Sequence, residues 1–188
     1  ITPWNMQRLL IDESDLSYAI LIFGIFFIIS NQVAGRILVP KYGTKLVMTL
    51  AFPIVTFSAL LTVISSSYFY FLLTFISGGI GWGASGPIGG IHSQLIERHF
   101  KKIITPYYAM GFNLGILLGG GLAGLIMRNN YEPYISFTIL SFLSILVSYF
   151  VYSFGYTRDL DFKAEGEKFK YTEKKVLLFG FLLFLVFG

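Results

Sequence analysis

Long apolar stretches, separated by short polar segments, make up most of the chain. Each stretch holds about 20 residues or more and lacks the strict alternation of a barrel strand, so the pattern predicts membrane-spanning helices. We expect Ser14 or Asp15 to cap the first span and Pro53 to kink the second. The predicted spans are residues 17–39, 46–66, 68–95, 104–127 and 133–154, followed by a truncated sixth from about residue 175. The predicted fold class is therefore an all-α transmembrane bundle.

Glycine is concentrated in the third and fourth predicted spans. In lipid, small residues let two helices approach closely, and a spacing of four residues places two glycines on one helix face. We expect these two spans to pack on each other and to slide or rock; ordinary packing within a helical bundle is the alternative interpretation. The glycines with this spacing are Gly79/Gly83, Gly86/Gly90, Gly111/Gly115 and Gly120/Gly124, with Gly119 in the same run.

Composition supports a membrane protein and narrows its chemistry. Of the 188 residues, 55% are hydrophobic and only 13% are charged, whereas a soluble domain has about 25% charged residues. The chain has no cysteine, which excludes disulfides and thiolate ligands. It has two histidines and no HExxH spacing, so we predict no metal site and no cofactor. The chain also begins without methionine and ends in the apolar run 176–188, so we expect the remainder of a longer polypeptide to complete the bundle.

The basic residues indicate how the spans are oriented. Twelve of the 14 lysines and arginines lie in the segments 36–45, 98–102 and 155–175, which all fall on one side if the spans alternate. Arg8 and Arg128 are left for the other side. Cytoplasmic loops carry an excess of Lys and Arg, so the three basic segments are predicted to be cytoplasmic. Because these charges sit in short loops between apolar spans, they do not indicate a nucleic-acid partner.

Several motifs resemble the major facilitator superfamily. Lys41, Gly43 and Lys45 are similar to the basic turn between helices two and three of that family. The glycines of residues 79–83 resemble its helix-four pattern, and those of 111–120 resemble its helix-five motif. The resemblance implies an MFS-type helical bundle with a central cytoplasmic loop.

The same resemblance divides the chain and suggests its source. Residues 1–154 would be a partial N-terminal bundle with family helices two to six, 155–175 the central cytoplasmic loop, and 176–188 the start of helix seven. The run 91–115 looks most like a bacterial permease branch, in which an acidic–basic pair follows helix four and a polar residue lies early in helix five. The implied location is a bacterial inner membrane.

Polar and aromatic residues near the middle of the spans are candidates for a solute pathway. Trp82, Ser85, Gly89 and His92 recur at helical spacing and share one face. A polar group in hydrocarbon must face a neighbouring helix or a wet cavity, so plain structural hydrogen bonding is the alternative for each. The candidate pathway residues are Asn31, Gln32, Trp82, Ser85, Gly89, His92 and Asn113. The candidate gating residues in the cytoplasmic loops are Arg36, Lys41, Gly43, Lys45, Glu97 and Arg98.

The resemblance implies secondary transport of a small solute by alternating access, with a coupling ion as an open question. All ten acidic residues lie in loops or at span ends, which favours an uncharged or amphipathic solute. A non-transporting membrane scaffold or sensor is one alternative, and a membrane-embedded enzyme is another. Ser141, Ser144 and Ser148 share a face of the fifth span, and we expect them to form hydrogen bonds between helices.

Overall fold

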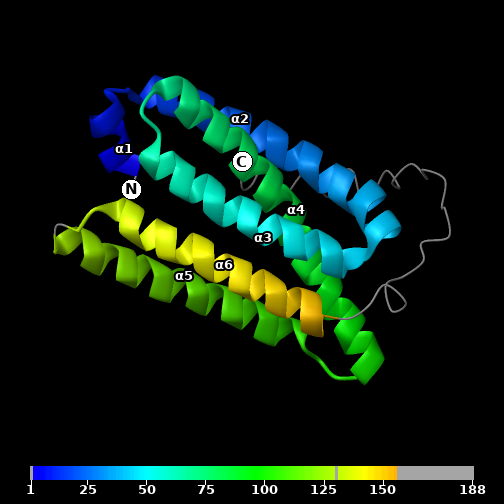
Figure 1. Ribbon diagram of the computed structural model, residues 1–188. Coiled ribbons are helices and arrows are strands. Elements are labelled where there is room, and N and C mark those ends of the chain that lie inside the picture. Colours follow the sequence, from blue (N-terminus) through cyan, green and yellow to red (C-terminus); the bar gives the residue numbers. More distant parts are fainter. Residues whose placement is uncertain (1, 130, 156–188) are drawn as a thin grey trace.

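The computed structural model describes residues 2–129 and 131–155, and these residues form a helical bundle without strands (Figure 1). In this part of the chain, four helical stretches are long and apolar enough to cross a membrane. The first of them, Glu13–Ile64, folds back on itself and supplies two antiparallel helices, α2 and α3. The elements are α1 (Thr2–Leu9), α2 (Glu13–Val33), the π-helix η1 (Ala34–Leu38), α3 (Val39–Ile64), α4 (Tyr68–Phe100), α5 (Thr105–Arg128) and α6 (Pro133–Phe154).

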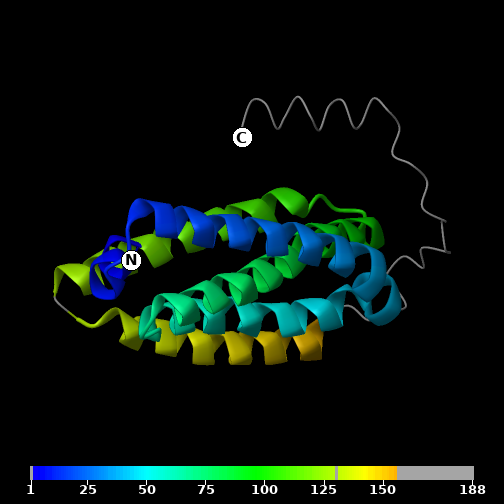
Figure 2. The same cartoon turned by 90° about the horizontal axis from the view of Figure 1, so that it is seen from above.

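Helix α4 lies at the centre of the bundle. It packs extensively against α2 and α3, and α3 in turn packs against α6. Seen from above, α4 crosses between α2 on one side and α3 with α6 on the other (Figure 2). Helix α5 makes only limited contact with α4 and α6, and most of its residues are exposed.

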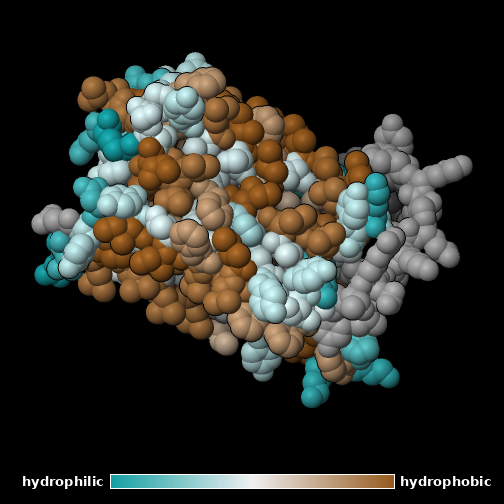
Figure 3. Space-filling view, in the orientation of Figure 1, coloured by the Kyte–Doolittle hydropathy of each residue, from teal (hydrophilic) through white to brown (hydrophobic). Residues whose placement is uncertain are grey.

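The polar residues gather at the two ends of the bundle. One end carries α1, the α3–α4 connection and the α5–α6 connection, and the other carries η1, the α4–α5 connection and the end of α6 (Figure 1). On the face shown in Figure 3, hydrophilic residues lie toward these ends and hydrophobic residues dominate between them. The described basic residues at the second end are Arg36, Lys41, Lys45, Arg98, Lys101 and Lys102. Their common end agrees with the predicted alternation of spans.

The turn between α2 and α3 is tighter than the predicted loop at 36–45. The chain stays helical through η1 and into α3, and the reversal is made at Gly43, whose φ of 83° and ψ of 159° are non-helical. This region of backbone conformation is essentially restricted to glycine. Pro53 lies inside α3, where the backbone dihedral angles stay helical, and the kink expected there stays a prediction.

The start of α2 differs from the predicted cap. Asp12 is the N-cap residue: its side chain accepts a hydrogen bond from the Asp15 backbone N–H, 2.8 Å away, and the Asp15 side chain accepts one from the Asp12 N–H. Because this capping box begins the helix at Glu13, the prediction of Ser14 or Asp15 as the cap is wrong. Helix α1 was not predicted, and Arg8 anchors it by donating to the Ser65 carbonyl in the α3–α4 connection.

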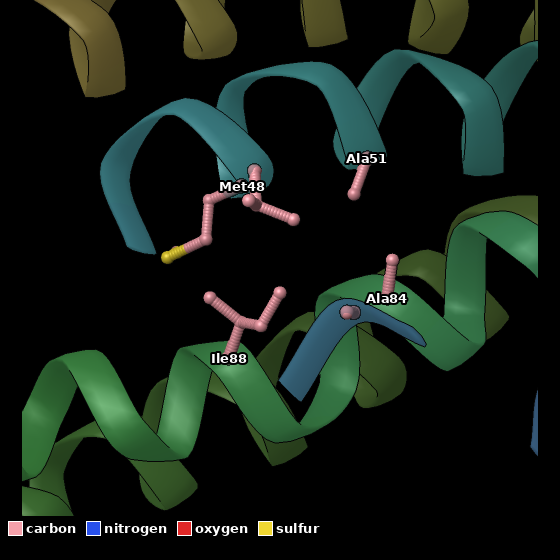
Figure 4. Close-up of a cluster of buried hydrophobic side chains, with 6 residues drawn as sticks. Met48, Ala51, Ala84 and Ile88 are labelled. Atoms are coloured by element: carbon pink, nitrogen blue, oxygen red, sulfur yellow. The ribbon is translucent and has the colours of Figure 1, made fainter. Parts of the chain in front are cut away.

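The core between α3 and α4 is built from small and medium side chains. Met48 and Ala51 of α3 point toward Ala84 and Ile88 of α4 (Figure 4). Ile88 is fully buried, and the cluster also includes Ala34 at the start of η1. Small side chains at such a contact let the two backbones approach closely, which is how helices gain packing contacts in lipid.

Hydroxyl groups join α3 to α6, as predicted from the serine stripe. Thr56 Oγ1 lies 2.6 Å from Ser144 Oγ, and the Ser141 hydroxyl donates to the Thr56 carbonyl at 3.1 Å. The expectation of hydrogen bonds between helices is therefore confirmed for Ser141 and Ser144. Ser148 is also buried, but its hydroxyl has no hydrogen-bond partner within the described ranges.

The α4 glycines at positions 79, 81 and 83 meet α2 and α3 rather than α5. A Cβ atom at Gly79 would lie 2.6 Å from the Phe23 carbonyl oxygen, and one at Gly83 would overlap the Phe27 carbonyl. On the opposite face, a Cβ at Gly81 would lie 2.9 Å from the Val55 backbone N. The remaining glycines of the predicted pairs have open space around them in the described structure: Gly86, Gly90, Gly111, Gly115, Gly119, Gly120 and Gly124. The expectation that the two glycine-rich spans pack on each other through these pairs is therefore wrong for the described residues.

Candidate functional site

A cavity of about 360 Å³ lies among α3, α4, α5 and α6. Its size falls at the lower end of the range for small-molecule sites. Its walls are mainly apolar and aromatic, with a few hydroxyl groups, and no charged side chain lines it. The lining residues are Phe52, Val55, Thr56, Trp82, Ser85, Gly86, Tyr108, Phe112, Leu140, Leu143, Ser144 and Val147.

Helix α4 supplies two predicted pathway residues, Trp82 and Ser85, to this cavity. Their position follows from the packing of α4, because the close approaches at Gly79 and Gly81 hold this helix between α2 and α3. Ser85 is buried, whereas Trp82 keeps 41% of its surface exposed. The wall formed by α4 therefore presents the apolar indole ring of Trp82 next to one hydrogen-bonding group, the hydroxyl of Ser85.

The cavity offers hydroxyl groups at two further places. Thr56 and Ser144 lie on the α3 and α6 walls and are hydrogen-bonded to each other. Tyr108 of α5 places its hydroxyl against Gly89 of α4, so a larger residue at Gly89 would displace the tyrosine hydroxyl. A predominantly apolar wall with a few fixed hydroxyl groups suits an uncharged molecule that has an apolar body and a small polar group.

The other predicted pathway residues do not line this cavity. Asn31 and Gln32 lie near the end of α2, a helix that supplies no residue to the wall. Asn113 is exposed on α5, next to the lining residue Phe112. Gly89 touches the cavity only through Tyr108.

The prediction missed the residues that α3, α5 and α6 contribute. Tyr108 and Phe112 are separated by four residues and so lie on one face of α5, which is a signal that the sequence does carry. Thr56 and Ser144 are hydroxyl residues inside apolar spans. That they meet across α3 and α6 depends on the tertiary packing, which the sequence alone does not reveal.

His92 lies farther along α4, at the end that carries the basic residues. Its Nδ1 atom lies 2.8 Å from the hydroxyl of Thr44, which is fully buried and directly follows the Gly43 turn. This hydrogen bond ties the start of α3 to α4, so in this arrangement the imidazole connects two helices.

No cluster of three or more potential metal-ligating side chains occurs among residues 2–129 and 131–155. The described part of the chain therefore offers no preformed metal site. The chemical groups that the cavity offers are its aromatic rings and the hydroxyls of Thr56, Ser144, Ser85 and Tyr108.

The comparison with protein-family models matches residues 1–188 to the Major Facilitator Superfamily. The chain belongs to this superfamily. No curated protein matches the chain. Members of the superfamily are transporters rather than enzymes, so the protein is an integral, multi-pass membrane transporter for small solutes.

The turn at residues 41–45 places two lysines against aromatic rings. The Lys41 ammonium nitrogen lies 5.1 Å from the ring centre of Tyr42, and that of Lys45 lies 5.2 Å from the ring centre of Tyr152 on α6. Arg36 is exposed within η1. The turn at Gly43 therefore directs Lys45 toward α6, whereas Lys41 lies over the ring of the next residue, Tyr42.

Glu97 fixes the corner between α4 and α5 in this superfamily member. Its Oε1 atom accepts hydrogen bonds from the backbone N–H groups of Ile104 at 2.6 Å and Thr105 at 2.7 Å. A carboxylate at a helix N-terminus satisfies free N–H groups and interacts favourably with the helix dipole. Arg98 is exposed on the next position of α4.

Proposed function

We propose that the protein is a secondary transporter that moves a small, uncharged or amphipathic solute by alternating access. The cavity among α3, α4, α5 and α6 carries this proposal, because its wall combines the Trp82 and Tyr108 rings with the hydroxyls of Ser85 and Thr56 and has no charge. A charged solute would lose its hydration there without gaining an opposite charge.

The proposal includes an orientation and a division of the chain. The end that carries Lys41 and Lys102 faces the cytoplasm, since cytoplasmic loops are rich in basic residues. The membrane is the inner membrane of a bacterium. Residues 1–154 correspond to family helices two to six; the proposed central loop 155–175 and the start of helix seven at 176–188 lie outside the described residues except for Gly155.

The coupling of transport is constrained by the position of the acids. Within the described ranges, the acidic residues are Asp12, Glu13, Asp15, Glu97 and Glu132, all at helix ends or in connections. The described spans therefore provide no carboxylate at mid-membrane depth that could bind a proton or sodium ion.

The test is uptake by the purified full-length protein in proteoliposomes. The uncharged probes are radiolabelled glucose, uridine, indole and benzyl alcohol, and the charged probes are glutamate, lysine and succinate. We expect saturable uptake of at least one uncharged probe and about a tenfold slower uptake after Trp82→Ala, a size typical of lost positioning contacts. Ser136→Ala, on α6 outside the cavity, is the control.

Two results would contradict the proposal. One is uptake restricted to charged probes. The other is the absence of saturable uptake for every probe when circular dichroism shows that the reconstituted protein is folded.

A further inference from the structure

A second cavity, which we call the α2–α3 groove, lies on the other side of α3 from the solute cavity. Its volume is about 340 Å³, and it shares no lining residue with the cavity among α3, α4, α5 and α6. Helices α2 and α3 form its walls and α4 its floor, because both wall helices pack on α4. The lining residues are Ser30, Leu38, Tyr42, Leu46, Val47, Leu50, Ala51, Ile54, Ile80 and Ala84.

The wall of the groove suits a hydrocarbon chain. Leu46, Leu50 and Ile54 recur every fourth residue along α3 and form a stripe about 12 Å long, parallel to the helix axis. Ser30 contributes the hydroxyl on the α2 wall, and this group already donates to the Ile80 carbonyl at 2.7 Å. The groove therefore has little to offer a polar solute, but it offers apolar surface over a length comparable to part of a lipid tail.

One end of the groove is positively charged. Tyr42 lines it there, and the Lys41 ammonium nitrogen lies 5.1 Å from the Tyr42 ring centre. Arg36 lies five residues before Lys41, within η1. No Asp or Glu occurs between residues 16 and 96, and Glu97, the acid at this end of the described bundle, binds the first amides of α5. Within residues 16–96, which include all of α3 and this end of α2, Lys41 therefore has no acidic residue beside it.

We propose that the α2–α3 groove binds an anionic phospholipid of the inner leaflet, with one acyl chain along the α3 stripe and the phosphate near Lys41. The apolar groove and the cation meet at the depth where a lipid changes from tail to headgroup. Basic sites between transmembrane helices on the cytoplasmic side are suited to anionic headgroups. Lys45 does not share this role, because its ammonium group lies over Tyr152 on α6.

Thermal unfolding of the delipidated full-length protein in a neutral detergent tests the proposal. Phosphatidylglycerol, phosphatidylcholine and inorganic phosphate are titrated separately. We expect phosphatidylglycerol to raise Tm at the lowest concentration, phosphatidylcholine to need more, and phosphate alone to have no effect. A ligand that binds only the folded state raises its stability by RT ln(1 + L/Kd), where L is the free ligand concentration, so the concentration at which Tm begins to rise reports the affinity.

Matched variants separate the headgroup site from the tail site. Lys41→Gln should weaken the apparent affinity for phosphatidylglycerol about fivefold, the effect expected for one basic residue near the membrane surface. Lys102→Gln removes a charge at the same end but away from the groove, and it should have a smaller effect. Leu50→Trp should weaken binding of both lipids by filling the groove, whereas Leu146→Trp, at an exposed position on α6, should not.

Three outcomes would overturn the proposal. Equal stabilisation by both lipids would mean that the groove holds ordinary bilayer lipid without headgroup selection. A rise in Tm with inorganic phosphate alone would show that the basic end of the groove binds a free anion rather than a lipid headgroup. No response to lipid, together with a concentration-dependent dimer in detergent, would assign the groove to a second copy of the chain.

Discussion

Replacing Gly79 by alanine should weaken the bundle at the contact between α4 and α2. The new Cβ atom would lie 2.6 Å from the Phe23 carbonyl oxygen, 3.0 Å from the Phe26 Cβ and 3.1 Å from the Phe27 N. An ordinary carbon–oxygen contact is about 3.5 Å, so the helices would have to separate by roughly 1 Å. The neighbours are mostly backbone, so no flexible side chain can move out of the way.

Relaxation in the other direction is also blocked. A shift of α4 away from α2 would press α4 onto α3. There the two backbones are already so close that a Cβ atom added at Gly81 would lie 2.9 Å from the Val55 backbone N. Overpacking of this kind costs about 1–3 kcal/mol. Gly90→Ala is the matched control, because it lies on the same helix and an added Cβ there meets nothing within 4 Å. Alanine at a helical position without a clash stabilises by up to about 1 kcal/mol.

The assay is reversible unfolding of the purified protein in mixed micelles, followed by circular dichroism as the denaturing detergent is increased. Gly79→Ala is expected to be less stable than the wild type by about 1–3 kcal/mol, and Gly90→Ala to be equal or more stable. Equal changes for the two variants would refute the reasoning, because they would show that the close approach of α2 and α4 is absent in the folded protein.

Three further predictions test other parts of the fold. Gly43→Ala should cost about 1–3 kcal/mol in the same unfolding assay, because φ at this turn is 83°; no loss would contradict the turn. Ser148→Ala should be neutral or stabilising, since the buried hydroxyl lacks a partner among the described residues, whereas Ser141→Ala should cost about 0.6 kcal/mol. In intact cells, a membrane-impermeant maleimide should label Asn129→Cys but not Lys102→Cys, and the reverse pattern would contradict the orientation.

The spans could be predicted from the sequence because length and hydropathy alone determine which segments can cross a membrane. Their exact ends could not. The start of α2 depends on a capping box at Asp12 and on the turn at Leu10, where φ is 53°. The turn at Gly43 was expected as a longer loop over residues 36–45, because three basic residues lie there and the sequence does not show that the chain stays helical on both sides of one glycine.

The glycines show the limit of pattern reasoning most clearly. The four-residue spacing identifies the face of α4 that lacks side chains and can approach another helix closely. It does not tell which helix meets that face. The structure places α2 against Gly79 and Gly83, while α5 touches α4 mainly at Gly89.

The candidate site was predictable only in part for the same reason. Trp82 and Ser85 could be found by counting inward along one span. Thr56, Ser144 and Tyr108 come from three other helices, and their meeting depends on packing between spans that are far apart in the sequence.

Site-directed labelling at Gly86 tests the central claim, alternating access to the cavity, most directly. Gly86 lines the cavity, an added Cβ there meets nothing within 4 Å, and residues 1–188 have no cysteine, so Gly86→Cys is the single reporter within these residues. The account predicts that an impermeant maleimide labels Gly86→Cys both in right-side-out vesicles and in inverted vesicles. It also predicts slower labelling when the transported uncharged solute is present. Labelling from one side alone, or a rate unchanged by the solute, would contradict it.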